Sequence, residues 1–134
     1  MTDATLRAWA YLSRVVEPPC AELAALVGRV GPVEAAERVR RGDVDDVLAR
    51  RTEARRDIDR AAADLDMLAR RGGRLICADD DEWPALMFTG FGAAGAKPRS
   101  GPPLALWALG PARLDETSQR SAALVGTRAA TRYG

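Results

Sequence analysis

The chain has 134 residues, which is enough for one ordinary domain or for a small domain with part of another. Hydrophobic residues make up 47% and charged residues 29%, as in globular proteins, and the formal net charge is only +1. The global charge therefore indicates neither a nucleic-acid partner nor a membrane surface, and any such binding must come from a local cluster.

The sequence contains no His, so it lacks the common zinc sites and His-based acid–base catalysis. Cys20 and Cys77 stand in unrelated contexts, and we expect both to be reduced core residues of a cytoplasmic protein. No run reaches the roughly 20 apolar residues of a membrane span, and the N-terminus shows no signal peptide. We expect no catalytic residue, no metal, no cofactor and no membrane contact.

The first half of the chain predicts a helical domain, because apolar residues recur at helical spacing between prolines and glycines. The expected helices span residues 4–16, 19–27, 32–41 and a short stretch capped by Asp43, with a turn at 28–32. Pro32 suits the first turn of its helix, and Gly42 suits a helix end. Val47 should face inward in the short helix.

Residues 53–71 show the clearest helical pattern. Ile58, Ala61, Leu65 and Leu68 form a narrow apolar stripe. Opposite charges stand four residues apart at Arg60–Asp64 and at Asp66–Arg70, a spacing that supports a helix. Gly72 then supplies a left-handed stop.

After Gly73 the pattern changes to short apolar runs. Strand candidates lie at 74–77, 104–109 and 122–125, with an acidic turn at 79–82 and a Gly/Pro-rich loop at 89–103. We therefore predict three parts: a helical domain at 1–72, a connecting region at 73–120 and the start of another domain at 121–134.

The last strand candidate runs directly into Gly126, Thr127 and Arg128. An apolar strand that enters such a turn is typical of the first strand and loop of a nucleotide-binding α/β domain. Backbone N–H groups of the loop bind phosphate oxygens, and Arg128 would add a charge-assisted hydrogen bond. The alternative is an ordinary strand and turn with an exposed Arg.

Two weaker patterns suggest DNA contact within the helical part. The turn at 26–32 has two glycines, as a helix-hairpin-helix motif does, although Arg29 between them is untypical. A basic run at 50–56 contains four arginines, but acidic residues are interleaved with them. A helix corner that needs Gly and a solvated helix surface are the respective alternatives.

Three motifs occur in a fixed order along the second half of the chain. They are residues 81–86 (DEWPAL), residues 102–110 (PPLALWALG) and residues 124–134 (LVGTRAATRYG). In this order they resemble the motifs of the DNA-processing protein A (DprA/Smf) family, with Thr127 where Ser is usual and Trp83 in place of Tyr. The resemblance to the helical N-terminal domain of the family is weak in motifs.

The resemblance implies a mainly α fold for this chain. The parts would be a small helical domain of sterile-alpha-motif or helix-hairpin-helix type, short strands, and the truncated first β-strand and loop of an α/β Rossmann-like domain. It also implies single-stranded DNA binding and loading of the RecA recombinase in DNA uptake and recombination, with a possible homodimer. Arg128 would contact the DNA backbone, supported by Gly126 and Thr127, while Tyr133 and Gly134 would shape the junction between the loop and the helix after it.

Two other functions remain open. Residues 126–128 are also compatible with the start of a nucleotide-processing enzyme, whose acidic catalytic residues would lie beyond this chain. The helical part is alternatively a stand-alone interaction module. Because a single strand without sheet partners leaves its backbone groups unpaired, we expect residues 121–134 to be loosely held or to pack against the helical domain.

Overall fold

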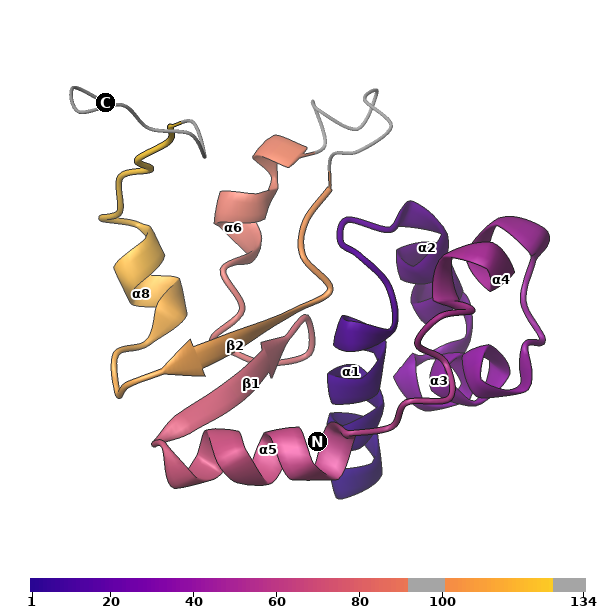
Figure 1. Ribbon diagram of the computed structural model, residues 1–134. Helices are drawn as coiled ribbons and strands as arrows, with labels where there is room; N and C mark the ends of the chain where they lie inside the picture. The colour runs from indigo at the N-terminus through magenta and orange to yellow at the C-terminus, as the bar shows by residue number, and fades with distance from the viewer. Residues whose placement is uncertain (92–100, 127–134) are drawn as a thin grey trace.

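The computed structural model describes residues 1–91 and 101–126, and within them the protein is mainly helical with one two-stranded sheet (Figure 1). The helices are α1 Asp3–Val15, α2 Ala21–Val30, α3 Pro32–Arg41, α4 Asp46–Thr52, α5 Ala61–Arg70, α6 Ala85–Phe88 and α8 Leu114–Ser118; the strands are β1 Gly73–Cys77 and β2 Ala105–Leu109. The predicted mainly α fold is confirmed. No described helix has both the length and the apolar character that crossing a membrane requires.

Helix α1 occupies the centre of the fold. Thr2 caps it, since its side chain accepts a hydrogen bond from the Thr5 N–H at 3.1 Å. All residues from Ala8 to Leu12 are buried, because α2 and α3 pack on one side of the helix and α5 and the sheet on the other (Figure 1). An α-helix buried around its circumference in this way organises the core on both sides.

Helices α2 and α3 form a hairpin joined at Gly31, whose φ of 81° favours Gly. The prediction of a turn at 28–32 was wrong, because Gly28 lies inside α2. The apolar face that buries Leu23, Leu26 and Val27 continues the helix past this glycine. Packing therefore outweighs the preference of Gly for a turn, which is about 1 kcal/mol relative to Ala in a helix.

The bounds of α3 agree with the prediction, with Pro32 at its start and Gly42 at its end in the left-handed region at φ 72°. The cap of α4 was predicted wrongly. Asp45, not Asp43, accepts from the Leu48 N–H at 2.9 Å, whereas the Asp43 N–H closes α3 by donating to the Arg38 carbonyl. Val47 is 44% exposed rather than inward-facing.

The long helix predicted at 53–71 is shorter in the structure and begins at Ala61. Asp59 accepts from the Ala61 N–H at 3.0 Å, and the Tyr11 hydroxyl donates to the Arg56 carbonyl at 2.8 Å. These contacts hold the backbone before Ala61 out of the helical pattern. The exposed fraction of Ile58 is 58%, so it does not join the stripe.

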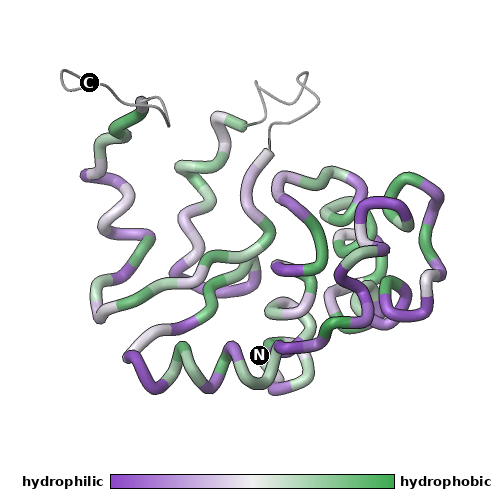
Figure 2. Tube along the Cα trace, in the orientation of Figure 1, coloured by the Kyte–Doolittle hydropathy of each residue, from purple (hydrophilic) through white to green (hydrophobic). Residues whose placement is uncertain are grey.

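The rest of α5 agrees with the prediction. Figure 2 shows polar and apolar residues alternating along it, with Ala61 buried and Leu65 and Leu68 packed against the core. The two predicted charge pairs form, with N–O distances of 3.9 Å for Arg60–Asp64 and 2.8 Å for Arg70–Asp66. Gly72, at φ 70°, follows the helix as expected.

Strands β1 and β2 pair antiparallel, with Leu75 opposite Trp107. Both lie where the sequence predicted strands. Leu75 and Cys77 belong to the same buried cluster as the residues of α1, α2 and α3, so the two-stranded sheet and the helices share one core. The domain boundary placed after residue 72 stays a prediction, and the acidic turn at 79–82 is observed.

The third strand candidate does not form a strand in the structure. Residues 121–126 have no regular secondary structure, and Leu124 and Val125 are 99% and 95% exposed. The physical reason is the one anticipated from the sequence: an apolar strand is stable only when neighbouring strands satisfy its backbone groups and cover its side chains.

Candidate nucleic-acid interface

The predicted phosphate loop begins at the edge of the described chain. Gly126 is exposed, and a Cβ placed on it would meet no atom within 4 Å. Thr127, Arg128, Tyr133 and Gly134 lie outside the described residues. Their predicted contacts with DNA therefore stay predictions.

An ion pair between Arg74 and Glu82 holds the segment before the loop. Arg74 Nε donates to Glu82 Oε2 at 2.8 Å, and a second bond joins Nη2 to Oε1. Arg74 also donates to the backbone carbonyls of Gly110 and Ala112, at 2.5 and 2.8 Å. Glu82 accepts from the Leu114 N–H at 2.7 Å, at the start of α8. These bonds tie β1 to the chain between β2 and residue 121.

The environment of Glu82 favours its charged form strongly. Hydrogen bonding from Arg74 lowers its pKa from 4.5 to about 2, although burial of the carboxylate opposes this change. Its side chain is only 13% exposed. From the sequence, Glu82 was placed in an acidic turn and in the first family-like motif, but this ion pair was not predicted. The available signal was Arg74, a charged residue in an otherwise apolar strand that precedes an acidic turn.

The aromatic residue of the first motif packs beside α6. The ring centroids of Trp83 and Phe88 are 5.0 Å apart, at an interplanar angle of 62°. Both rings line a surface cavity of about 390 Å³, together with Trp9 of α1 and the segment at 102–104. The first two family-like motifs, far apart in sequence, thus meet at one place on α1 and α2.

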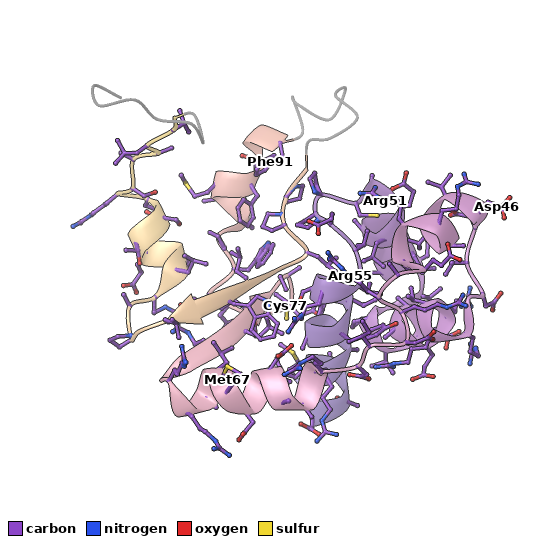
Figure 3. The ribbon with its side chains drawn as sticks, viewed as in Figure 1. Asp46, Arg51, Arg55, Met67, Cys77 and Phe91 are labelled. Carbon is purple, nitrogen blue, oxygen red and sulfur yellow. The ribbon has the colours of Figure 1, made fainter. Side chains whose placement is uncertain are left out.

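Two of the four arginines in the basic run at 50–56 connect parts of the helical fold. Arg51 pairs with Glu22 at 3.2 Å and donates to the Pro19 carbonyl, while Arg55 pairs with Glu17 at 2.6 Å. These arginines cross-link α4 and the turn after it to the segment between α1 and α2 (Figure 3). Of the arginines within the described residues, those without an ion-pair partner are Arg29, Arg50, Arg71 and Arg120.

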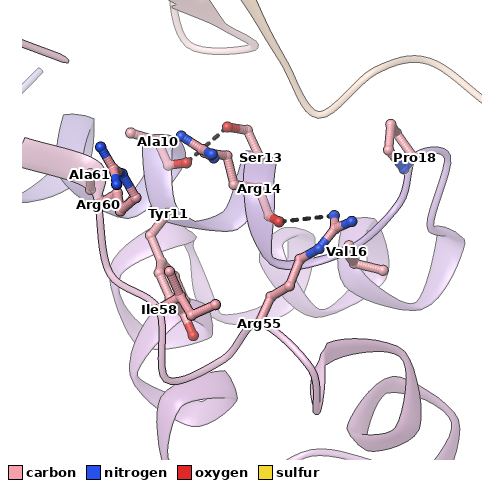
Figure 4. Close-up of a pocket in the computed structure, with 10 residues that line it drawn as sticks. All are labelled: Ala10, Tyr11, Ser13, Arg14, Val16, Pro18, Arg55, Ile58, Arg60 and Ala61. Atoms are coloured by element: carbon pink, nitrogen blue, oxygen red, sulfur yellow. Dashed lines mark hydrogen bonds between the residues drawn. The ribbon is translucent and has the colours of Figure 1, made fainter. Parts of the chain in front are cut away.

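A second cavity, of about 420 Å³, lies between α1 and the segment before α5 (Figure 4). Three arginines line it, as a phosphate site would require. Arg14 and Arg60 both face Asp64, however, and Arg55 is paired with Glu17 while it reaches the Arg14 carbonyl at 3.4 Å. Each cation is already compensated, so this cavity is a poor anion site.

The hairpin between α2 and α3 does not have the geometry expected of a helix-hairpin-helix DNA contact. Gly28 lies within α2, and Gly31 alone forms the turn. The Gly31 N–H donates to the Val27 carbonyl at 2.8 Å, so it is not available to a phosphate oxygen. The alternative, a helix corner that needs Gly for its backbone conformation, accounts for the sequence pattern.

The two cysteines are free thiols in protected positions. Burial raises the pKa of Cys77, and Asp80, which accepts from both its N–H and its thiol, contributes in the same direction, so that the pKa is about 12. Burial also raises the pKa of Cys20. Among the described residues no cluster of three Cys, Asp or Glu side chains has a metal-binding arrangement. The acidic turn is used internally, because Asp80 closes it.

No family model and no solved structure matches the chain. Two curated proteins, from two strains of Mycobacterium tuberculosis, match it over 136 aligned residues with 69% identity. Both carry the provisional name DNA processing protein DprA, and the match covers all of this chain. The chain matches the N-terminal portion of the DprA family. The family indicated by the three ordered motifs is thereby confirmed. The chain spans 35% of the length of these DprA relatives.

Proposed function

We propose that the protein acts in DNA uptake and recombination, binding single-stranded DNA and helping to load RecA on it, and that this chain carries the accessory N-terminal part. The observation that carries the proposal is the 69% identity, over the whole chain, to proteins named DprA. The DNA contacts are assigned to Gly126, Thr127 and Arg128, with Tyr133 and Gly134 shaping the loop. We assign no catalytic role to the chain and place it in the cytoplasm.

The paired arginines of the helical part support the proposal that the loop, and not the helices, makes the DNA contacts. A surface on which most guanidinium groups already face carboxylates releases few counterions on contact with DNA, so it adds little affinity. The bond network of Arg74 and Glu82 instead positions the chain that runs from α8 to Gly126. The helical part and the two-stranded sheet are thus suited to position the loop at 126–128, while the loop itself would make the DNA contacts.

Fluorescence anisotropy of a labelled oligo-dT at low and moderate salt tests the proposal, with Arg128→Ala as the variant and Arg70→Ala as the matched control. Arg70 is an exposed arginine already paired with Asp66. We expect binding that weakens with salt, weakens further in Arg128→Ala and is unchanged in Arg70→Ala. Equal binding by all three proteins would contradict the assignment of the loop.

A stand-alone interaction module is the second candidate, because the structure has an exposed apolar groove. Met67 of α5 and Trp107 and Leu109 of β2 line it and are 49%, 38% and 66% exposed. Exposed apolar residues that cluster in this way mark interaction surfaces. Sedimentation of the native chain and of Leu109→Asp tests whether this groove is an interaction surface. A native dimer that the substitution dissociates would favour the interaction module and would place the predicted homodimer interface at the groove.

A further inference from the structure

The cavity at the two motif segments has the features of a binding site for a flat, uncharged group. Trp83 and Phe88 form an edge-to-face pair on one side, and Pro103 and Leu104 lie on another. Among the described residues no charged side chain lines the cavity, so the chemistry of this lining is that of aromatic and aliphatic surfaces. Such a cavity of about 390 Å³ offers stacking and apolar contact but no partner for a phosphate.

Trp9 adds an unused hydrogen-bond donor to this cavity. Trp9 lines the cavity and is 4% exposed, and its Nε1–H has no hydrogen-bond partner in the part of the chain that the structure describes. A buried donor without an acceptor is unfavourable by roughly 1–3 kcal/mol, and native proteins have few of them. An acceptor brought by a ligand would satisfy it. Since the N–H is closed to solvent, the ligand reaches it only when a lining side chain changes rotamer.

Gly28 keeps one side of the cavity open. It lies inside α2, where Ala would stabilise the helix, and a Cβ placed on it would meet no atom within 4 Å. Packing therefore does not require a glycine at this position. The missing side chain leaves free space beside the aromatic pair, where a longer residue would project.

We propose that this cavity binds one unpaired base of single-stranded DNA, and this inference rests on the proposed function. Every base has a π-face that stacks on an aromatic side chain, and every base has acceptor atoms on its edge for the Trp9 N–H. The sugar and phosphate would stay outside, because the lining has no cation. The site takes any base, since a single donor offers no pattern by which to distinguish one base from another.

Free thymidine tests the cavity without any phosphate. In a ¹H–¹⁵N spectrum of the 134-residue chain, we expect the Trp9 indole signal to move downfield with thymidine while that of Trp107 stays fixed. Gly28→Leu, which fills the cavity and favours the helix, should abolish the response, whereas Gly28→Ala should retain it. An unmoved Trp9 signal in the native chain, or an equal response in Gly28→Leu, would overturn the proposal.

Oligonucleotide binding separates this inference from the proposed function. We expect native protein to bind oligo-dT roughly 5- to 100-fold more tightly than an abasic strand of equal length, as stacking of one base implies. Gly28→Leu should lose that preference with no change in salt dependence, because no phosphate contact is removed. A preference kept in Gly28→Leu refutes the base site alone. If neither strand binds at low salt, the proposed function fails for this chain, and the thymidine response alone decides the base site.

Discussion

Replacing Glu82 by Gln should destabilise the protein in a pH-dependent way. The substitution keeps the shape and an acceptor for the Leu114 N–H but removes the charge that faces Arg74. The pKa of Glu82 falls from 4.5 to about 2 on folding, which corresponds to at most roughly 3 kcal/mol. Because the Arg74 side chain is 33% exposed, solvent screening reduces this figure, and we expect a loss of about 1–2 kcal/mol.

The sign of the pH dependence follows from the lowered pKa. The stabilisation is fully present above pH 4.5, where the carboxylate is ionised in both folded and unfolded chains, and it is lost as the pH falls through about 2. Thermal unfolding followed by circular dichroism at pH 7 should show a Tm lower by roughly 4–8 °C in Glu82→Gln. The difference should shrink between pH 4.5 and 2.

Asp81→Asn is the matched control, since the neighbouring Asp81 makes no ion pair in the part of the chain that the structure describes. It should leave the Tm within about a degree or two of the native value. Two results would refute the reasoning: an equal loss in both variants, or a Glu82→Gln deficit that persists undiminished at pH 2.

Two further predictions concern the Tyr11 hydroxyl and a pair of glycines. Tyr11→Phe removes the donor to the Arg56 carbonyl and should lower the free energy of unfolding by about 1 kcal/mol in urea. Burial raises the pKa of Tyr11 from 10.0 to about 12. The contribution of the neutral hydroxyl to the stability of the fold is therefore fully present below pH 10 and is lost as the pH rises through 12. An ionisation of Tyr11 near pH 10 in an absorbance titration would contradict this. Gly73→Ala should destabilise by about 1–3 kcal/mol, because the new Cβ would lie 2.7 Å from the backbone carbonyl oxygen of Ala108. Gly28→Ala should instead stabilise by about 0.5–1 kcal/mol, because its Cβ would meet no atom within 4 Å. Urea unfolding of the two glycine variants checks the opposite signs, and equal effects would count against both.

Local signals predicted much of the fold. Pro32 and Gly42 fixed both ends of α3, because a ring-locked φ begins a helix and a left-handed residue ends one. The strands β1 and β2 lie where their apolar runs placed them. In each case the deciding interaction lies within a few residues of the element that it defines.

The errors arose where a distant contact decides the local structure. The pattern at 53–60 is helical, but the Tyr11 hydroxyl, 45 residues away, binds the Arg56 carbonyl instead. Gly28 was expected in a turn, although the buried face of α2 continues the helix through it. The unpartnered donor of Trp9 depends on the assembled fold, so no spacing along the chain indicates it.

The central position of α1 has a consequence for the way the chain folds during synthesis. This helix leaves the ribosome before α5, β1 and β2, which together cover one side of it. Ser13, for example, accepts a hydrogen bond from Trp107 of β2 across 94 positions in sequence. During synthesis, the apolar face of α1 that packs on the sheet must therefore stay uncovered until β1 and β2 have been made. Contacts of such long range slow folding, and they make the final closure of the core a late, cooperative step.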